Sequence, residues 1–173
     1  MSVTRFGLLV FIAYMVGILV YSTFVQAQTA KEIAQKSFPS VVLLFMEDDK
    51  GQPMSLGSGF FVRENIVATC FHVVKNAARG YAKPIGQKMK LDIQGIVGVD
   101  QRRDLALLAV SGAKALTLPI GESSQVSVGD EVYVISNPMG LEGTFSQGIV
   151  SGIRQVGLDT LFQITAPVSP GSS

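Results

Sequence analysis

The segment Ala68-Thr69-Cys70-Phe71-His72-Val73-Val74 is the strongest indication of the fold of this chain, and it contains the single histidine among the 173 residues. An aspartate, Asp104, stands 32 residues further along, at the start of the apolar run Leu105-Ala106-Leu107-Leu108. The last residue of the sequence is a serine, Ser173. Each of these three polar residues therefore stands at the edge of a segment that is predicted to be a β-strand.

A histidine, an aspartate and a serine in this chain order are candidates for a catalytic triad. A serine hydroxyl alone is a poor nucleophile at neutral pH, and a neighbouring imidazole makes it competent by taking its proton. A carboxylate on the other imidazole nitrogen fixes the tautomer. Backbone N–H groups must then stabilise the oxyanion, and Gly171 lets the backbone approach a substrate closely because it has no Cβ.

The rest of the chain is predicted to be mainly β-structure. Its 18 glycines often precede short runs of Val, Ile, Leu or Phe, which favours strands over helices. A capping box at Thr29 and Glu32 predicts a helix of about two turns over 29–37, and one helical turn is expected within 71–78. Strands are expected at 41–45, 58–62, 65–69, 88–94, 105–110, 131–136, 144–153 and 161–165. Short strands at this spacing indicate barrels or a sandwich, and the continuous apolar run at 105–110 predicts a strand buried on both faces.

Residues 1–27 have the pattern of a targeting segment. Arg5 precedes a continuous apolar or small stretch at 6–21, and Val25-Gln26-Ala27 supplies the small residues of a signal-peptidase site. The alternative is an uncleaved membrane anchor, because the 20 residues at 6–25 can span a bilayer. The protein is therefore expected to be exported, as a periplasmic or secreted protein, or anchored in the membrane by 6–25. Any membrane contact is expected only through this segment.

Charge and cysteine content restrict the possible partners. The chain has 14 Lys and Arg, 13 Asp and Glu, and no basic run longer than Arg102-Arg103, so no nucleic acid is expected as a partner. The single cysteine, Cys70, cannot form an intrachain disulfide. It is either available for intermolecular pairing or, as we expect, a small buried apolar side chain.

Six segments in order resemble the trypsin-like proteases of the HtrA (DegP) group. They are Gly57-Ser58-Gly59-Phe60, Thr69-Cys70-Phe71-His72-Val73-Val74, Asp104-Leu105-Ala106-Leu107-Leu108, Ser136-Asn137-Pro138-Met139-Gly140-Leu141, Ser146-Gln147-Gly148-Ile149-Val150-Ser151 and Pro170-Gly171-Ser172-Ser173. No single segment is decisive, but their order is specific, and the resemblance runs from about residue 35 to the end.

The resemblance implies an all-β, chymotrypsin-like fold of two orthogonally packed barrels with the active site between them. It makes His72 the general base, Asp104 its orienting partner and Ser173 the nucleophile, with the N–H groups of Gly171 and Ser173 as the oxyanion hole. It implies polypeptide substrates, no metal or nucleotide cofactor, and an oligomer that is often a trimer. The expected organisation is a leader at 1–27, a first barrel at 28–114 and a partial second barrel at 115–173.

The chain also departs from the family pattern. Ser173 is the last residue of the sequence, whereas the family pattern continues with two glycines, further strands and a PDZ domain. Ser172 replaces the usual Asn or Asp, and Ser172 and Ser169 are alternative nucleophiles that only the Gly-x-Ser register disfavours. Pro167 stands where enzymes that cut after Lys or Arg carry an acid, so a small or apolar residue is expected before the cleaved bond.

Two functions therefore remain open from the sequence. The first is a serine endopeptidase acting on unfolded or misfolded exported proteins, with activity expected for the full gene product and not for residues 28–173 alone. An incomplete second barrel would leave sheet edges unpaired, and the terminal carboxylate would stand beside the oxyanion site. The second is a non-catalytic binding or chaperone-like module, or an inactive fragment.

Overall fold

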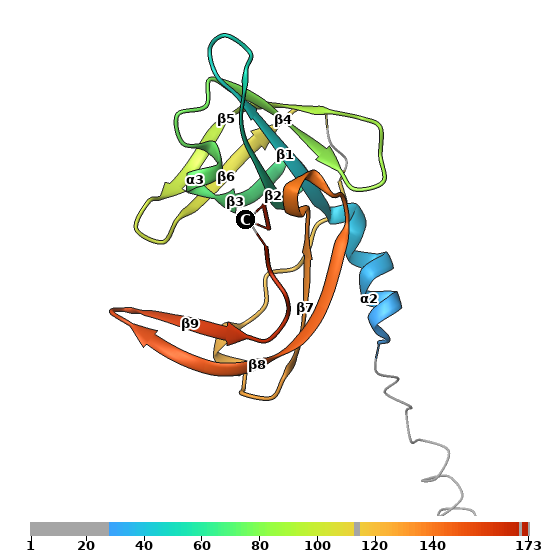
Figure 1. The fold of residues 1–173 in the computed structure, drawn as a ribbon, viewed down its shortest axis with the longest axis vertical. Helices are drawn as coiled ribbons and strands as arrows, with labels where there is room; N and C mark the ends of the chain where they lie inside the picture. Colours follow the sequence, from blue (N-terminus) through green and yellow to red (C-terminus); the bar gives the residue numbers. More distant parts are fainter. Residues whose placement is uncertain (1–27, 113–114, 170, 173) are drawn as a thin grey trace, which may run out of the picture.

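A computed structural model describes residues 28–112, 115–169 and 171–172, and these residues are mostly β-structure. They form a closed barrel of six strands followed by an open sheet of three strands (Figure 1). The predicted signal peptide or anchor at 1–27 lies outside the described residues. Among the residues that are described, no helix is both long enough and apolar enough to cross a membrane. The predicted all-β class, with a closed first barrel and an incomplete second one, is confirmed.

The barrel closes because each of its strands pairs with two neighbours, in the order β1-β2-β3-β6-β5-β4, and every pairing is antiparallel. Closure removes the unpaired sheet edges that an open sheet retains. The six strands are β1 (Val41–Glu47), β2 (Pro53–Arg63), β3 (Ile66–Cys70), β4 (Arg79–Pro84), β5 (Leu91–Asp100) and β6 (Leu105–Val110).

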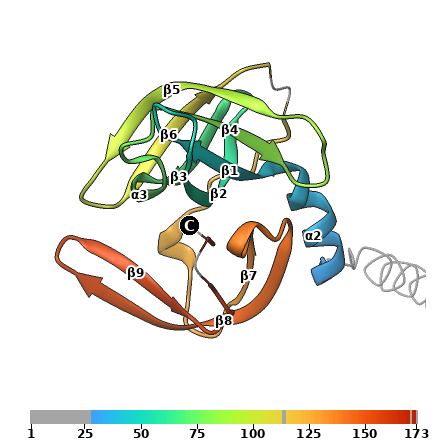
Figure 2. The ribbon, with the colours of Figure 1, turned by 45° about the horizontal axis from the view of Figure 1, so that its top comes forward.

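The second sheet has the order β7-β8-β9, again with antiparallel pairing. Its strands are β7 (Glu131–Ser136), β8 (Thr144–Val156) and β9 (Asp159–Ile164). The helical elements are short: α2 (Ala30–Ser37), η1 (Phe38–Ser40), α3 (Phe71–Val74), η2 (Ser123–Gln125) and η3 (Pro138–Gly140). After β9 the chain turns back and runs between the sheet and the barrel (Figures 1 and 2).

Local sequence signals explain the helices well. The predicted capping box is present, because the Glu32 N–H donates to Thr29 Oγ1 at 3.3 Å and the Thr29 N–H donates to a Glu32 carboxylate oxygen at 2.8 Å. These two bonds satisfy N–H groups that the first turn of a helix leaves free. The helical turn expected within 71–78 is α3, which is confined to Phe71–Val74.

Two predictions about strands were wrong. The strand expected at 88–94 is β5, which begins at Leu91 and continues to Asp100 because two bulges keep it in register with β6. The strand β6 is not buried on both faces: Leu108 is fully buried, whereas Leu105 and Leu107 are 52% and 39% exposed. A barrel wall has one face toward its core and one toward solvent, so apolar side chains on the outer face stay exposed.

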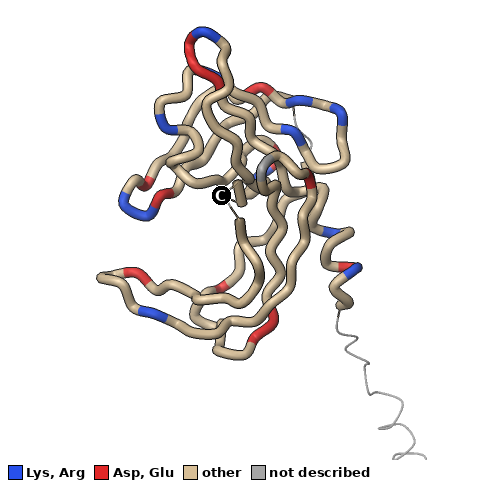
Figure 3. Tube along the Cα trace, in the orientation of Figure 1, with Lys and Arg blue, Asp and Glu red and all other residues tan. Residues whose placement is uncertain are grey.

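The strand β4 was not predicted at all. Its residues, Arg-Gly-Tyr-Ala-Lys-Pro, have only two buried members, Ala82 and Pro84. It pairs with β1 on one side and β5 on the other, and so completes the ring of strands. The barrel encloses a continuous apolar core whose largest fully buried side chains are Phe61, Leu44, Leu108, Val42, Val67, Val73 and Val110. Charged residues lie mainly on the turns and connections around it (Figure 3).

Candidate active site

The pairing of β3 with β6 brings His72 and Asp104 together. Cys70, at the end of β3, pairs with Leu105, at the start of β6. The residues just beyond this pair on each strand are therefore neighbours in space, although 32 positions separate His72 from Asp104. A further backbone hydrogen bond joins α3 to the residue before β6. The N–H of Phe71, the first residue of α3, donates to the Asp104 carbonyl oxygen at 3.0 Å.

The two side chains contact each other in the arrangement that a triad needs. His72 Nδ1 lies 2.5 Å from Asp104 Oδ2, and the His72 backbone N–H donates to Asp104 Oδ1 at 2.8 Å. Asp104 adopts a left-handed backbone conformation with φ of 56°, which is uncommon outside glycine but which aspartate adopts more readily than most residues. Both carboxylate oxygens are thus used to hold one histidine.

Electrostatics favours the charged form of Asp104. The hydrogen bond from the His72 side chain, and then that from its backbone N–H, lower the pKa of this carboxyl below its ordinary value. An ionised carboxylate accepts the Nδ1 proton and leaves Nε2 as the basic nitrogen. The side chains of His72 and Asp104 are 57% and 45% exposed, so a substrate can reach them.

The predicted nucleophile, Ser173, lies outside the described residues, so its position relative to His72 stays a prediction. The turn before it is described: the Ser172 N–H donates to the Ser169 carbonyl at 2.9 Å, and Gly171 has a φ of 90° that favours glycine. The Ser172 hydroxyl lies 3.1 Å from Ser136 Oγ and accepts the Ser169 N–H at 3.2 Å. The hydroxyl of this alternative nucleophile therefore already has hydrogen-bond partners in the turn and in β7.

Asn137 and Ser58 hold this turn against the barrel, a role that sequence reasoning missed. The Ser58 hydroxyl donates to the Gly171 carbonyl at 2.9 Å and accepts the Asn137 N–H at 2.9 Å. The fully buried Asn137 side chain donates to the Val42 carbonyl at 3.0 Å and accepts the Gly143 N–H at 3.1 Å. Both residues belong to the segments that resemble the HtrA group, but their part in holding the turn is seen only from their burial in the folded structure.

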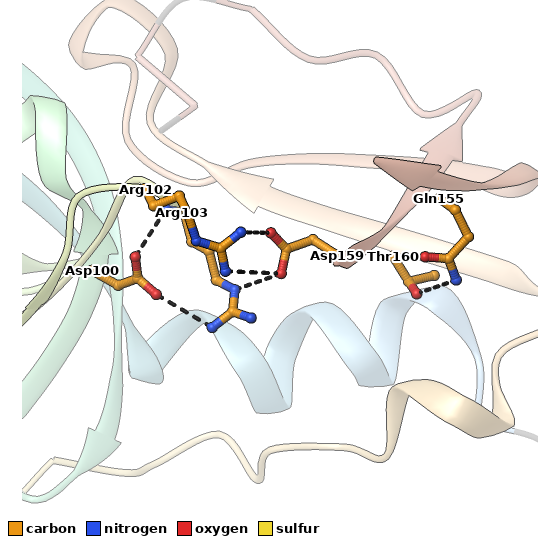
Figure 4. Close-up of polar contacts among 6 residues, drawn as sticks. All are labelled: Asp100, Arg102, Arg103, Gln155, Asp159 and Thr160. Atoms are coloured by element: carbon orange, nitrogen blue, oxygen red, sulfur yellow. Dashed lines mark hydrogen bonds and ion pairs between the residues drawn. The ribbon is translucent and has the colours of Figure 1, made fainter. Parts of the chain in front are cut away.

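A second connection joins the turn before Asp104 to Asp159, the first residue of β9 (Figure 4). Arg102 Nη1 and Arg103 Nε lie 2.5 and 2.7 Å from the two carboxylate oxygens of Asp159, and Arg103 also pairs with Asp100 at 3.3 Å. The hydrogen bonds from Arg103 and then Arg102 lower the pKa of Asp159. A candidate triad residue thus follows directly on a turn that is linked to the open sheet.

Cys70 completes the immediate surroundings of the pair. It is partly buried, whereas the sequence predicted a buried side chain. Burial, followed by the nearby charge of Asp104, raises the pKa of its thiol. The thiol also lines a largely apolar cavity of about 490 Å³ between the barrel and the second sheet, together with Leu105, Tyr133 and Ser172.

Comparison with known proteins identifies the family of this chain. The family model of the trypsin-like peptidase domain matches residues 57–173. The chain is 36% identical over 128 residues to a probable periplasmic serine endoprotease DegP-like from Bartonella henselae, covering 70% of this chain and 25% of that protein. It is 33% identical over 166 residues to serine protease PepD from Mycobacterium tuberculosis, covering 84% and 35%. It is 29% identical over 159 residues to the chloroplastic Protease Do-like 1 from Arabidopsis thaliana, covering 80% and 36%.

A solved structure supports the fold. The HtrA-type protease AlgW, determined with a tripeptide, superposes with a TM-score of 0.76 at 24% identity, covering 84% of this chain and 49% of that one. The chain spans between 25% and 36% of the length of the three relatives above. Because the family model covers residues 57–173, which are most of the sequence, the chain belongs to the trypsin-like peptidase family, with HtrA/DegP-like serine proteases as its homologues.

Proposed function

We propose that the gene product is an HtrA-type serine endopeptidase that hydrolyses peptide bonds of exported, unfolded or misfolded polypeptides. The observation that carries the proposal is the doubly bonded pair of His72 and Asp104. The names of the relatives, a periplasmic DegP-like endoprotease among them, support both the reaction and the export. Pro167, six positions before Ser173, supports a small or apolar residue before the cleaved bond.

In this proposal Ser173 Oγ attacks the peptide carbonyl carbon while its proton passes to His72 Nε2. The N–H groups of Gly171 and Ser173 stabilise the resulting oxyanion, each by about 3 kcal/mol. The imidazolium, which Asp104 stabilises, then gives its proton to the leaving amine as the acyl-enzyme forms. A water molecule, deprotonated by His72, attacks the acyl-enzyme, and the proton returns to Ser173 as the acid product leaves.

The test is turnover of an unfolded polypeptide such as denatured casein, together with covalent labelling by a fluorophosphonate. Changing Ser173 to Ala should abolish labelling and turnover, and Asp104→Asn should lower kcat about 10⁴-fold because the wrong imidazole tautomer is held. Ser169→Ala is the matched control and should retain turnover. Labelling that survives in Ser173→Ala and disappears in Ser169→Ala would reject the assigned nucleophile.

A second candidate, a binding or chaperone-like module, is favoured by the exposed apolar side chains of the open sheet. Ile149, Ile153, Leu161 and Phe162 are each at least 37% exposed. Such a surface can hold apolar segments of an unfolded client. This function predicts that the protein suppresses client aggregation without turnover and that His72→Ala leaves the suppression unchanged. Suppression that depends on His72 would count against it.

A further inference from the structure

The single cysteine of the chain lies beside the candidate base and its carboxylate. Cys70, His72 and Asp104 each present one ligand atom within 4.8 Å of the ligand atoms of the other two. They supply a thiol, an imidazole and a carboxylate, which are the three side-chain types that zinc binds in proteins. The triad chemistry proposed above does not use the thiol, so its presence here has no role in that reaction.

We propose that Cys70, His72 and Asp104 form an inhibitory site for a thiophilic divalent cation such as Zn²⁺. A tetrahedral zinc ion with bond lengths of about 2.0–2.3 Å holds its ligand atoms roughly 3.3–3.8 Å apart. The 4.8 Å limit on the present separations means that side-chain adjustments of about 1 Å assemble the site. Water occupies the fourth position, as it does in other three-ligand zinc sites.

A cation can reach these three residues. The side chains of His72 and Asp104 are 57% and 45% exposed. Cys70 lines the cavity of about 490 Å³ between the barrel and the second sheet. Among the described residues, the three ligands come from the end of β3, from α3 and from the position before β6, all held by the Cys70–Leu105 strand pairing. The donors are thus mounted on a rigid part of the barrel.

Metal binding at this site would inactivate the base whichever imidazole nitrogen is the ligand. Coordination through Nδ1 replaces the 2.5 Å contact with Asp104 that fixes the tautomer. Coordination through Nε2 occupies the lone pair that must accept the proton of the nucleophile. The Cys70 thiol loses its proton to solvent when it binds, and no bond of the protein is broken.

Cobalt(II) titration of the purified full chain, with a non-thiol reductant, tests the site directly. A bound thiolate should produce a charge-transfer absorption in the near-ultraviolet, and a tetrahedral site should produce intense visible bands. Because the chain has one cysteine and one histidine, these signals can be assigned to Cys70 and His72. Zn²⁺ should displace the cobalt and abolish both absorptions.

Substituting each of the three ligands in turn measures its contribution to metal binding. Changing Cys70 to Ser or Ala should abolish the thiolate band, and His72→Asn and Asp104→Asn should each weaken binding at least about tenfold. Asp49→Asn, which removes an exposed carboxylate in the β1–β2 turn, should leave binding unchanged. Thermal unfolding shows whether each variant is folded. If one of the two Cys70 variants does not fold, the other still tests the thiolate ligand. Absence of the thiolate band in the parent chain, or an equal affinity in all the variants, would overturn the proposal.

The activity measurement rests on the proposed peptidase function and uses the full gene product, for which activity is expected. Zn²⁺ should inhibit turnover reversibly, with recovery on adding a chelator. Cys70→Ala should need at least about tenfold more zinc for half-inhibition, relative to its own activity without zinc. A full gene product that hydrolyses nothing would reject the peptidase function, while the cobalt spectra of the 173-residue chain would still decide the metal site. Equal zinc sensitivity of the parent and Cys70→Ala would reject inhibition at this site.

Discussion

The closed barrel and the open three-stranded sheet are built from similar strands but bury very different amounts of apolar surface. Of the buried apolar side chains among the described residues, only Val150 and Ala166 lie outside 41–110. In the open sheet, Leu161 and Phe162 of β9 remain 53% and 38% exposed. An alternating strand buries one face only when a second layer covers that face, and the barrel supplies that layer by curving back on itself.

The barrel and the open sheet contact each other in two different ways. Near Asn137 and Ser58 the contact is buried and fully hydrogen-bonded, whereas at Arg103 and Asp159 it consists of exposed ion pairs. Buried polar groups are costly to leave unpaired, while exposed ion pairs are weak and screened by salt. The junction should therefore be held mainly by the buried amide, with a smaller contribution from the charges.

The greatest loss of stability is predicted in the barrel core, and it is compared here with a loss in the open sheet. Phe61 is fully buried in the barrel, so Phe61→Ala should lower the free energy of unfolding by about 3–5 kcal/mol. Phe162→Ala, in the half-exposed sheet, should cost less than about 1.5 kcal/mol because little area is lost from a dry core. Urea unfolding measures both. Equal losses would mean that the open sheet has a core as dry as that of the barrel.

The next effect concerns the buried junction. Asn137→Ala should cost about 2–3 kcal/mol, because it leaves the Val42 carbonyl and the Gly143 N–H without their partners. Asn65→Ala, at an exposed turn of the barrel, is the matched control and should stay within about 0.5 kcal/mol of the parent. Calorimetry measures the loss of unfolding free energy in each of the two variants. A neutral Asn137→Ala would show that this amide does not hold the junction.

A third substitution locates close packing inside the open sheet. A Cβ at Gly148 would lie 2.2 Å from the Ala166 backbone nitrogen, so Gly148→Ala should cost about 1–3 kcal/mol through forced backbone shifts. Gly95 of β5 has no neighbour within 4 Å of such a Cβ, and Gly95→Ala should be neutral or slightly stabilising. Urea midpoints compare the two. A tolerant Gly148 would mean that β8 moves away from the following segment at little cost.

The smallest effect is expected at the exposed ion pairs. Asp159→Asn should lower the urea midpoint slightly near neutral pH. Hydrogen bonds from Arg103 and Arg102 lower the Asp159 pKa in the folded protein, so their stabilisation is present above the ordinary aspartate pKa of about 3.9. It is lost as the pH falls through the lower folded value.

The difference between Asp159→Asn and the parent should therefore disappear in acid and shrink at high salt. Asp49→Asn, an exposed carboxylate away from the junction, serves as the control. A difference that persists in acid would show that Asp159 acts by packing rather than by charge.

Local patterns predicted the fold class and the candidate pair, and they failed where partners are distant in sequence. The capping box of α2 was confirmed because its bonds join Thr29 and Glu32 within one turn. The strand β4 was missed because it is stabilised by pairing with β1 and β5 rather than by its own apolar pattern. The outward face of β6 was assigned wrongly because an apolar run does not reveal which side of a barrel wall each residue faces.

The amino-acid sequence alone established the residue types and their order: one histidine, an aspartate before an apolar strand, and glycine-rich strands that favour barrels. Those features follow from composition and short-range periodicity, which act within a few residues. The folded structure was needed to show that His72 contacts Asp104, that Asn137 is fully buried and that Cys70 lies beside the pair. Each of these depends on strand pairing and packing between distant segments, because β-sheet contacts are set by register across the fold and not by neighbours along the chain.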